Sequence, residues 1–413
     1  MNIFGQIILA TLIISYLINL IVDYLNIKSL KSDVPQEFKG IYDQESYQKS
    51  QAYTKDKTAF GTIENTFNLI LLLCFWFLGG FNALDLWVRS FGFNELISGL
   101  VFIASLALAK TVISLPFSLY STFVIEEKYG FNKSTLSIFV SDLFKGLLLS
   151  FIIGLPILAL LLTLFEKAGS LAWLYCWIAV TAFSIIMQIL APTLIMPLFN
   201  KFSPMPDGEL KTAILDYASK VNFSVQDIYV MDGSKRSSKS NAFFSGLGKF
   251  KKIALFDTLI ENHTVPELVA VLAHEIGHYK KKHILQGMIL SILSSGAMFY
   301  LLSLFLTKAQ LFEAFKMQNI SIYAGMLFFG LLYTPVDFLL SIAVNLLSRK
   351  NEYEADEFAA KTIQKPMVMA DTLKKLSKDN LSNLTPHPLY VFFNYSHPTA
   401  LQRIEAIQRL AIN

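Results

Sequence analysis

The chain has 413 residues, of which 54% are hydrophobic and only 16% charged, and its mean hydropathy is +0.48. This balance excludes an ordinary soluble protein and favours the membrane class, while a formal net charge of +4 gives no support for a nucleic-acid partner. The two cysteines, Cys74 and Cys176, lie in apolar runs without Cys/His metal spacing, so we interpret both as packing residues.

Seven apolar segments are long enough, or nearly so, to cross a bilayer, which takes about 20 helical residues. They lie at 5–23, 65–88, 97–120, 139–165, 171–198, 286–306 and 321–347. Three of them carry charges that are costly against lipid, namely Lys110, Asp142 with Lys145, and Asp337. We therefore expect these helices to line a polar interior. For Asp142 and Lys145, a position at a helix end with the charges directed toward water is an equal alternative.

The basic residues predict the orientation of the chain. The loop after the first segment carries Lys28, Lys31, Lys39, Lys49, Lys55 and Lys57, whereas no basic residue precedes that segment. The positive-inside rule places this loop in the cytoplasm, and with it the segment 199–285 and the tail from 348. The first segment lacks a basic n-region and a cleavage site, so we expect it to be a retained helix.

This pattern predicts four consecutive regions in the chain. Residues 1–198 hold five membrane helices, 199–285 form a soluble segment, 286–347 hold two more membrane helices, and 348–413 form a second cytoplasmic segment. In the soluble segment we expect one amphipathic helix and three short strands. The helix covers 209–221 and the strands cover 227–231, 241–245 and 252–256, with a hairpin turn through Gly246, Leu247, Gly248 and Lys249 between the last two.

A metal-binding motif lies at the end of the soluble segment. His274-Glu275-Ile276-Gly277-His278 is an HExxH pattern on a stretch with helical periodicity. Residues four apart project from one face of a helix, so His274 and His278 can chelate one ion, and Glu275 can take a proton from the attacking water. The alternative is a helix end whose two histidines merely face polar neighbours.

A catalytic zinc site usually has a third protein ligand. His283 lies about 140° around a continuous helix from His278, so we expect it to point away from the other two imidazoles. The longer HExxHxxGxxH pattern is absent because Lys281 and Ile284 stand where it needs Gly and His. The better candidate is an acidic helix that begins near Ser348.

Glu352 and Asp356 lie four residues apart on one face of this acidic helix. Glu352 can bind the metal while Asp356 accepts the free ring N–H of a ligand histidine and fixes its tautomer. Taken alone, a run of acidic residues is more often a solvated surface. The nearby HExxH motif favours the metal-binding interpretation instead.

Several further motifs, spread over nearly the whole chain, resemble the type I CAAX prenyl proteases and their bacterial homologues. The matching motifs are Glu126-Glu127-Lys128-Tyr129-Gly130-Phe131-Asn132, Pro197-Leu198-Phe199-Asn200-Lys201-Phe202, Ser240-Asn241-Ala242-Phe243, Leu255-Phe256-Asp257-Thr258-Leu259, the HExxH motif, Ser348-Arg349 with Glu352 and Ala355-Asp356, and Ser396-His397-Pro398. The resemblance implies a mainly α fold with about seven transmembrane helices around a polar chamber. A cytoplasmic zinc protease domain with a small β-sheet would cap this chamber.

The resemblance also implies roles for individual residues. It assigns Glu352 as the third ligand of one Zn²⁺ per chain, and it makes His397 and Arg403 the groups that hold the substrate carbonyl and stabilise the oxyanion. Asn241 and Ala242 resemble the strand edge to which an extended substrate adds. Without the resemblance, His397 is more often an ordinary turn histidine. A plain hairpin edge is then an equal alternative for the strand.

We therefore predict an integral-membrane zinc endopeptidase that acts on peptides or proteins. Its substrates are prenylated CAAX-type peptides or, in a bacterium, membrane-associated peptides and damaged membrane proteins. The chain shows no ER-retention tail at Leu410-Ala411-Ile412-Asn413, which favours a bacterial inner membrane over the endoplasmic reticulum. The alternatives are a membrane transporter, suggested by the charges within helices, and a metal-binding quality-control scaffold with little turnover.

Overall fold

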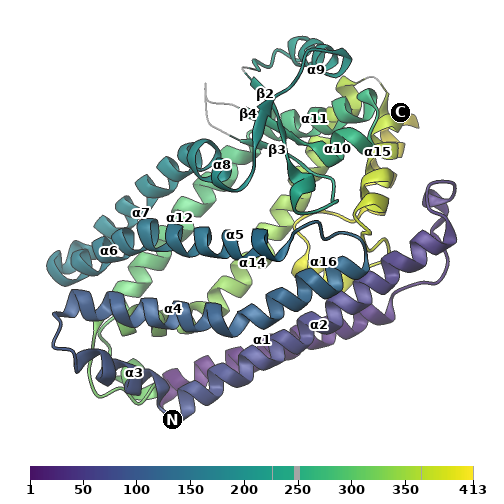
Figure 1. The fold of residues 1–413 in the computed structure, drawn as a ribbon. Helices are drawn as coiled ribbons and strands as arrows, with labels where there is room; N and C mark the ends of the chain where they lie inside the picture. The colour runs from purple at the N-terminus through teal and green to yellow at the C-terminus, as the bar shows by residue number, and fades with distance from the viewer. Residues whose placement is uncertain (226, 246–251, 364, 413) are drawn as a thin grey trace.

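The computed structural model describes residues 1–225, 227–245, 252–363 and 365–412. Within these ranges seven helical segments are long and apolar enough to cross a membrane. They are Ile3–Lys28, Gln44–Phe77, Glu95–Glu126, Leu136–Lys167, Gly169–Phe199, His283–Phe305 and Ile322–Thr362. Figure 1 shows a small sheet with helices α9, α10, α11 and α15 gathered at one end of these long segments, and the N-terminus at the other end. The predicted mainly α membrane architecture is confirmed.

Four of the spans are single helices, and three contain π-helical turns. The single helices are α1 (Ile3–Lys28), α2 (Gln44–Phe77), α12 (His283–Phe305) and α14 (Ile322–Thr362). The interrupted spans are α4 (Glu95–Tyr120) with 121–126, α5 (Leu136–Leu149) with 150–154 and α6 (Leu155–Lys167), and α7 (Ala172–Leu190) with 191–195 and α8 (Met196–Phe199). Pro156 and Pro192 lie at two of these π turns, where a missing N–H breaks the regular ladder.

The second span differs from its predicted bounds of 65–88 at both ends. Helix α2 begins at Gln44 because the Asp43 side chain accepts a hydrogen bond from Ser46 N at 2.7 Å and caps a polar first turn. The helix ends before Gly79, whose φ of 76° is a left-handed conformation that glycine adopts without strain. Residues after it form a separate helix, α3 (Gly80–Arg89). Hydropathy alone did not reveal this break.

The seventh span continues far beyond its predicted end at 347. Helix α14 runs for 41 residues, so the apolar span and the acidic helix expected from Ser348 are one helix. The predicted boundary between 347 and 348 lies within it. Its polar end carries Glu352 and Asp356, which are both buried. A rigid membrane helix therefore fixes the position of the candidate third ligand.

Three of the four charged residues expected within the spans have polar partners. The Asp142 carboxylate accepts two hydrogen bonds from the Arg236 guanidinium, at 2.7 and 3.0 Å. Lys110 Nζ donates to Asn68 Oδ1 at 2.7 Å, and Lys145 Nζ donates to the Leu198 carbonyl at 2.8 Å. Asp337 lines a cavity of about 660 Å³ between α12 and α14. These contacts lower the cost of placing charged groups within membrane helices.

A four-stranded sheet lies beside the motif helix, in the order β1-β2-β4-β3. The strands are β1 (Phe202–Pro204), β2 (Asp227–Met231), β3 (Ala242–Ser245) and β4 (Lys252–Phe256). β2 and β4 are parallel, whereas β1–β2 and β3–β4 are antiparallel pairs. The expected strands at 227–231 and 252–256 have the predicted bounds, and β3 begins one residue later than expected. The predicted hairpin turn at Gly246 to Lys249 lies outside the described residues.

The remaining helices cover the sheet or join the membrane segments. They are α9 (Glu209–Lys220), α10 (Asp257–Asn262), α11 (Val265–Lys280), α13 (Ala309–Ala314), α15 (Pro366–Asp379), α16 (Pro388–Asn394) and α17 (Ala400–Ile412). Buried residues of α9, β4, α11, α14, α15 and α17 form one apolar core. This core holds the motif helix α11 against the polar end of α14.

Candidate active site

Helix α11 presents the HExxH motif. Near the start of α11, the Glu267 side chain accepts a hydrogen bond from Thr264 N at 2.7 Å, a capping interaction that orders the first turn. Gly277 allows α11 to approach α14 closely, because a Cβ there would lie 3.0 Å from the Ala355 carbonyl oxygen. The short separation brings both motif histidines within reach of Glu352.

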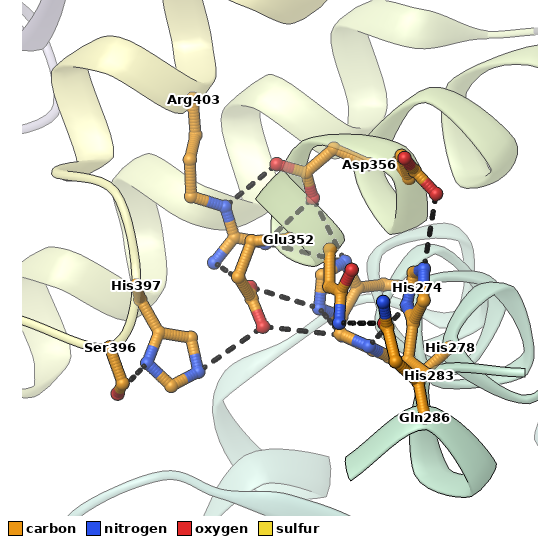
Figure 2. A network of polar contacts seen from close by, with 11 residues as sticks. His274, His278, His283, Gln286, Glu352, Asp356, Ser396, His397 and Arg403 are labelled. Atoms are coloured by element: carbon orange, nitrogen blue, oxygen red, sulfur yellow. Dashed lines mark hydrogen bonds and ion pairs between the residues drawn. The ribbon is translucent and has the colours of Figure 1, made fainter. Parts of the chain in front are cut away.

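The two motif histidines and Glu352 converge on one point (Figure 2). His274 Nε2 lies 3.1 Å from His278 Nε2, and the Glu352 carboxylate oxygens lie 3.4 Å from His274 Nε2 and 3.2 Å from His278 Nε2. One ligand atom from each of the three residues lies within 4.8 Å of the others. The predicted ligand set is thus assembled in space from two helices, α11 and α14.

Asp356 fixes the orientation of the His274 ring. Its Oδ1 lies 2.9 Å from His274 Nδ1, so the network assigns the proton to Nδ1 and leaves the Nε2 lone pair facing Glu352. Arg403 holds Asp356 in turn, with Nε donating to Oδ2 at 2.7 Å and a second guanidinium nitrogen donating to Oδ1 at 2.6 Å. This bidentate pair fixes the carboxylate that fixes the imidazole.

His283 lies against His278, contrary to the expectation that it points away. Its Nδ1 is 3.0 Å from His278 Nδ1, and its Nε2 is 3.2 Å from Glu354 Oε2. The expectation assumed one continuous helix, but α11 ends at Lys280 and Lys282 adopts a left-handed φ of 61° before α12 begins at His283. The sequence between Lys280 and His283 holds no Gly or Pro that reveals this break.

His283 and Glu354 therefore orient His278 as Asp356 orients His274. We expect His283→Ala to weaken metal binding about 10-fold or more, within the range for residues that hold a ligand imidazole. Titration of the apoprotein with zinc against a competing chelator measures this effect. Glu354→Ala should show a smaller change of the same sign. Wild-type zinc affinity in both variants would show that the contact is incidental.

These donors fit a cation. With the His274 and His278 Nδ1 protons directed at Asp356 and His283, two bare Nε2 atoms and a carboxylate face one another. Burial lowers the pKa of His274, but the hydrogen bonds to Asp356 and Glu352 outweigh it and raise that pKa to about 9. The cluster thus takes up a proton unless a metal cation occupies its place. Two imidazoles and a carboxylate are the donor set of many catalytic zinc sites.

Glu275 lies on α11 between the two motif histidines. Its side chain is half-buried and lines two cavities that adjoin the motif, of about 660 and 330 Å³. Among the residues that the structure describes, none forms a hydrogen bond or an ion pair with its carboxylate. Glu275 is therefore available to a water molecule and a peptide in these cavities.

His397 and Arg403 approach the site from the C-terminal segment. His397 Nε2 is 3.3 Å from Glu352 Oε1, its Nδ1 is 2.9 Å from Ser396 Oγ, and its side chain is 60% exposed. The Arg403 guanidinium is buried and also lies 3.2 Å from Glu352 Oε2. His397 can thus reach a ligand in the cavity, whereas Arg403 is engaged with the two carboxylates.

Arg349 contributes a contact that the sequence did not assign. One guanidinium nitrogen donates to the carbonyls of Val391 at 3.1 Å and Tyr395 at 2.5 Å. These bonds tie α14 to the turn that carries His397. The Ser348-Arg349 motif was the available signal, although it gave no indication of the partner.

The start of β3 lies at the smaller of the two cavities that adjoin the motif, which we call the catalytic cavity. Asn241 and Ala242 line the cavity of about 330 Å³ together with His274, Glu275 and Glu352. Among the described residues β3 pairs with β4 alone, so its other side is an edge of the sheet. His387 accepts a hydrogen bond from Leu389 N at the start of α16.

This combination of spanning helices and an HExxH site defines the class of membrane-embedded metallopeptidases. Comparisons with known proteins agree: residues 23–201 match the family described as CAAX prenyl protease N-terminal, five membrane helices, and residues 204–411 match peptidase family M48. The chain is 35% identical to CAAX prenyl protease 1 homolog of Arabidopsis thaliana, covering 98% of this chain and 97% of that protein.

Two further relatives are similar over most of their length. Probable CAAX prenyl protease 1 of Schizosaccharomyces pombe is 39% identical, covering 88% of this chain and 80% of that protein. The crystal structure of S. mikatae Ste24p superposes with a TM-score of 0.91 at 34% identity, covering 98% and 99% of the two chains. The chain belongs to the CAAX prenyl protease 1 family of M48 metalloendopeptidases. This membership decides against the transporter interpretation.

Proposed function

We propose that the protein uses one zinc ion, held by His274, His278 and Glu352, to hydrolyse a peptide bond in prenylated CAAX-type substrates. The observation that carries this proposal is the convergence of His274 Nε2, His278 Nε2 and the buried Glu352 carboxylate beside Glu275, whose own carboxylate has no hydrogen bond or ion pair among the described residues. A zinc ion bound there would supply Lewis acidity to the attacking water and to the scissile carbonyl.

The protein's own groups carry the proton and the charge. Glu275 removes a proton from the attacking water and returns it to the leaving amine. His397, exposed at the cavity, donates a hydrogen bond to the oxygen on which negative charge develops. Arg403 adds positive charge near the same oxygen and holds Asp356, so its role combines electrostatic stabilisation with positioning.

The edge of β3 positions the substrate. An extended peptide adds to Asn241 and Ala242 through main-chain hydrogen bonds. These bonds hold the scissile bond over the metal site and do not depend on the side chains of the peptide. The Asn241 carbonyl already accepts from Phe256 N at 3.2 Å, so the strand start is fixed to β4. Such pairing orients the peptide without selecting a sequence.

Prenylated substrates are supported by two observations. The named relatives are CAAX prenyl proteases. The cavity of about 660 Å³ runs from Glu275 and His278 between α12 and α14, and Leu290, Leu340 and Val344 lie along it. Such a space suits an apolar chain attached next to the scissile bond. Membrane-associated peptides or damaged membrane proteins are the other substrates that the sequence predicts for a bacterial host.

The experiment that tests this proposal compares a farnesylated CAAX peptide with its unmodified form, using the purified protein in detergent. We expect cleavage of the farnesylated peptide, loss of activity with phenanthroline, and recovery on adding about one equivalent of zinc. Products are identified by mass spectrometry. Activity that survives complete metal removal would contradict the metal mechanism, and equal cleavage of both peptides would contradict a prenyl requirement.

We also propose that the regions 199–285 and 348–413 face the cytoplasm and form the catalytic part, as the lysine-rich loop after α1 suggests. Cysteine labelling of residues 24–64 from the cytoplasmic side alone is the expected result, and labelling from outside would invert the topology. The bacterial inner membrane remains a prediction, which fractionation of the host would test.

A further inference from the structure

A second cavity lies next to the catalytic one. It measures about 580 Å³ and is formed by α1, α2 and the segment that follows α15. Most of its lining is polar and rich in amides, including Asn19, Asn65, Asn383 and Asn394. Polar side chains on membrane helices are energetically costly against lipid, and they typically mark a functional site. None of the catalytic roles described above uses this cavity.

This amide-lined cavity is continuous with the path along the edge strand. Lys239 lines it, while the next residues, Ser240 and Asn241, line the catalytic cavity, and Asn380 lines both. Asn380 accepts from Ser240 N at 3.1 Å and donates to the Ser240 carbonyl at 3.2 Å. The backbone from 239 to 241 therefore leads directly from one cavity into the other.

The amide-lined cavity contains a lysine that has Glu126 nearby but forms no direct ion pair among the described residues. Lys57 of α2 is exposed at the lining, and its Nζ lies 5.6 Å from the centre of the Tyr53 ring. Among the described residues, none forms a hydrogen bond or an ion pair with this ammonium. Lys239, by contrast, is paired with Glu126 at 2.8 Å, and Asp23 accepts from Thr62 Oγ1 at 3.3 Å. Lys57 is thus the group available to an anionic ligand.

The strand direction indicates which end of a substrate reaches Lys57. A peptide that adds antiparallel to β3 runs with its C-terminal end from Ala242 past Asn241 toward Lys239. A CAAX motif ends the chain three residues after its prenylated cysteine. A cut after that cysteine leaves the carboxylate about 10 Å beyond the scissile bond, roughly three residues of extended chain. A chain that continues past Asn241 in this direction runs toward Lys239, which lines the amide-lined cavity.

We propose that the amide-lined cavity binds the free C-terminal carboxylate of the substrate, with Lys57 as its ion-pairing cation. This inference rests on the proposed function, because it concerns the same substrate. The neighbouring amides donate hydrogen bonds to the terminal peptide groups. For this cut, the contact favours a peptide that ends three residues after the scissile bond.

The test uses one farnesylated CAAX peptide in two forms, with a free C-terminal acid and with a C-terminal amide. We expect wild-type kcat/KM to favour the acid by about 10-fold, the scale of one charged hydrogen bond. In Lys57→Met the acid-to-amide ratio should fall to about one, while Lys57→Arg should restore most of the preference. Lys55→Met removes a nearby lysine of α2 that does not line the cavity and should keep the wild-type ratio.

A wild-type ratio near one, or a preference that persists in Lys57→Met, would overturn the proposal. Binding of the same two peptides to Glu275→Gln, measured by fluorescence anisotropy, gives the ratio without cleavage. Absence of hydrolysis with either peptide would therefore reject the proposed function alone, and the binding ratio would still decide whether the cavity recognises the carboxylate.

Discussion

Glu275→Gln should lower kcat for peptide hydrolysis by about 100- to 10,000-fold, the usual contribution of a general base. The amide keeps the size of the side chain and its place between the two cavities, but it cannot accept the proton of the attacking water. Zinc content should stay at the wild-type level, because the three proposed ligands are unchanged. The measurements are single-turnover kinetics and metal analysis on the same preparation.

This variant separates chemistry from binding. Substrate should remain bound to Glu275→Gln, so the variant also serves to capture natural substrates. Near-normal turnover in a zinc-loaded preparation would contradict the role of Glu275. Loss of zinc together with activity would instead show that Glu275 supports the metal site itself.

Glu352→Ala should remove most of the bound zinc and reduce hydrolysis in proportion. The truncation deletes one of three ligand side chains and leaves the buried guanidinium of Arg403 without the carboxylate that lies 3.2 Å away. Asp356→Asn should have a smaller effect, about 10- to 100-fold in metal affinity or activity, because Asp356 contacts His274 and is not one of the three proposed ligands. Zinc content and kcat/KM on both variants give the comparison.

Glu357→Ala is the matched control on the same helix, because Glu357 pairs only with Lys361 at the surface among the described residues. It should retain wild-type zinc and activity. Circular dichroism and thermal unfolding confirm that each variant folds, which matters for the buried Asp356. Equal and mild effects in all three variants would mean that the acidic end of α14 is a charged surface and that another residue is the third ligand.

The sequence predicted the membrane architecture because apolar runs of about 20 residues have few other structural interpretations. Helix ends were less predictable, since they depend on local events such as the left-handed Gly79 and the Asp43 cap. The unbroken α14 was also missed, because its composition changes from apolar to acidic near Ser348 while its backbone continues. Composition reports the surroundings of a helix, not its length.

The candidate site was predictable where chemistry has a fixed spacing. The four-residue step places His274 and His278 together on any α-helix, and the acidic pair of α14 has the same step. The contacts of His283 with His278 and Glu354 were missed because a helical wheel does not apply across the left-handed Lys282. The position of Lys57 beside the site was not predictable for another reason. It depends on how α2 packs against segments more than 180 residues away in sequence.

Anomalous X-ray scattering at the zinc absorption edge, recorded on crystals of the wild-type protein, tests the central claim most directly. We expect a single anomalous peak per chain, at zinc–nitrogen and zinc–oxygen distances of about 2.0–2.2 Å from His274 Nε2, His278 Nε2 and a Glu352 oxygen. A zinc peak at other residues would contradict the account. So would the absence of a peak at this point in crystals grown from fully active protein.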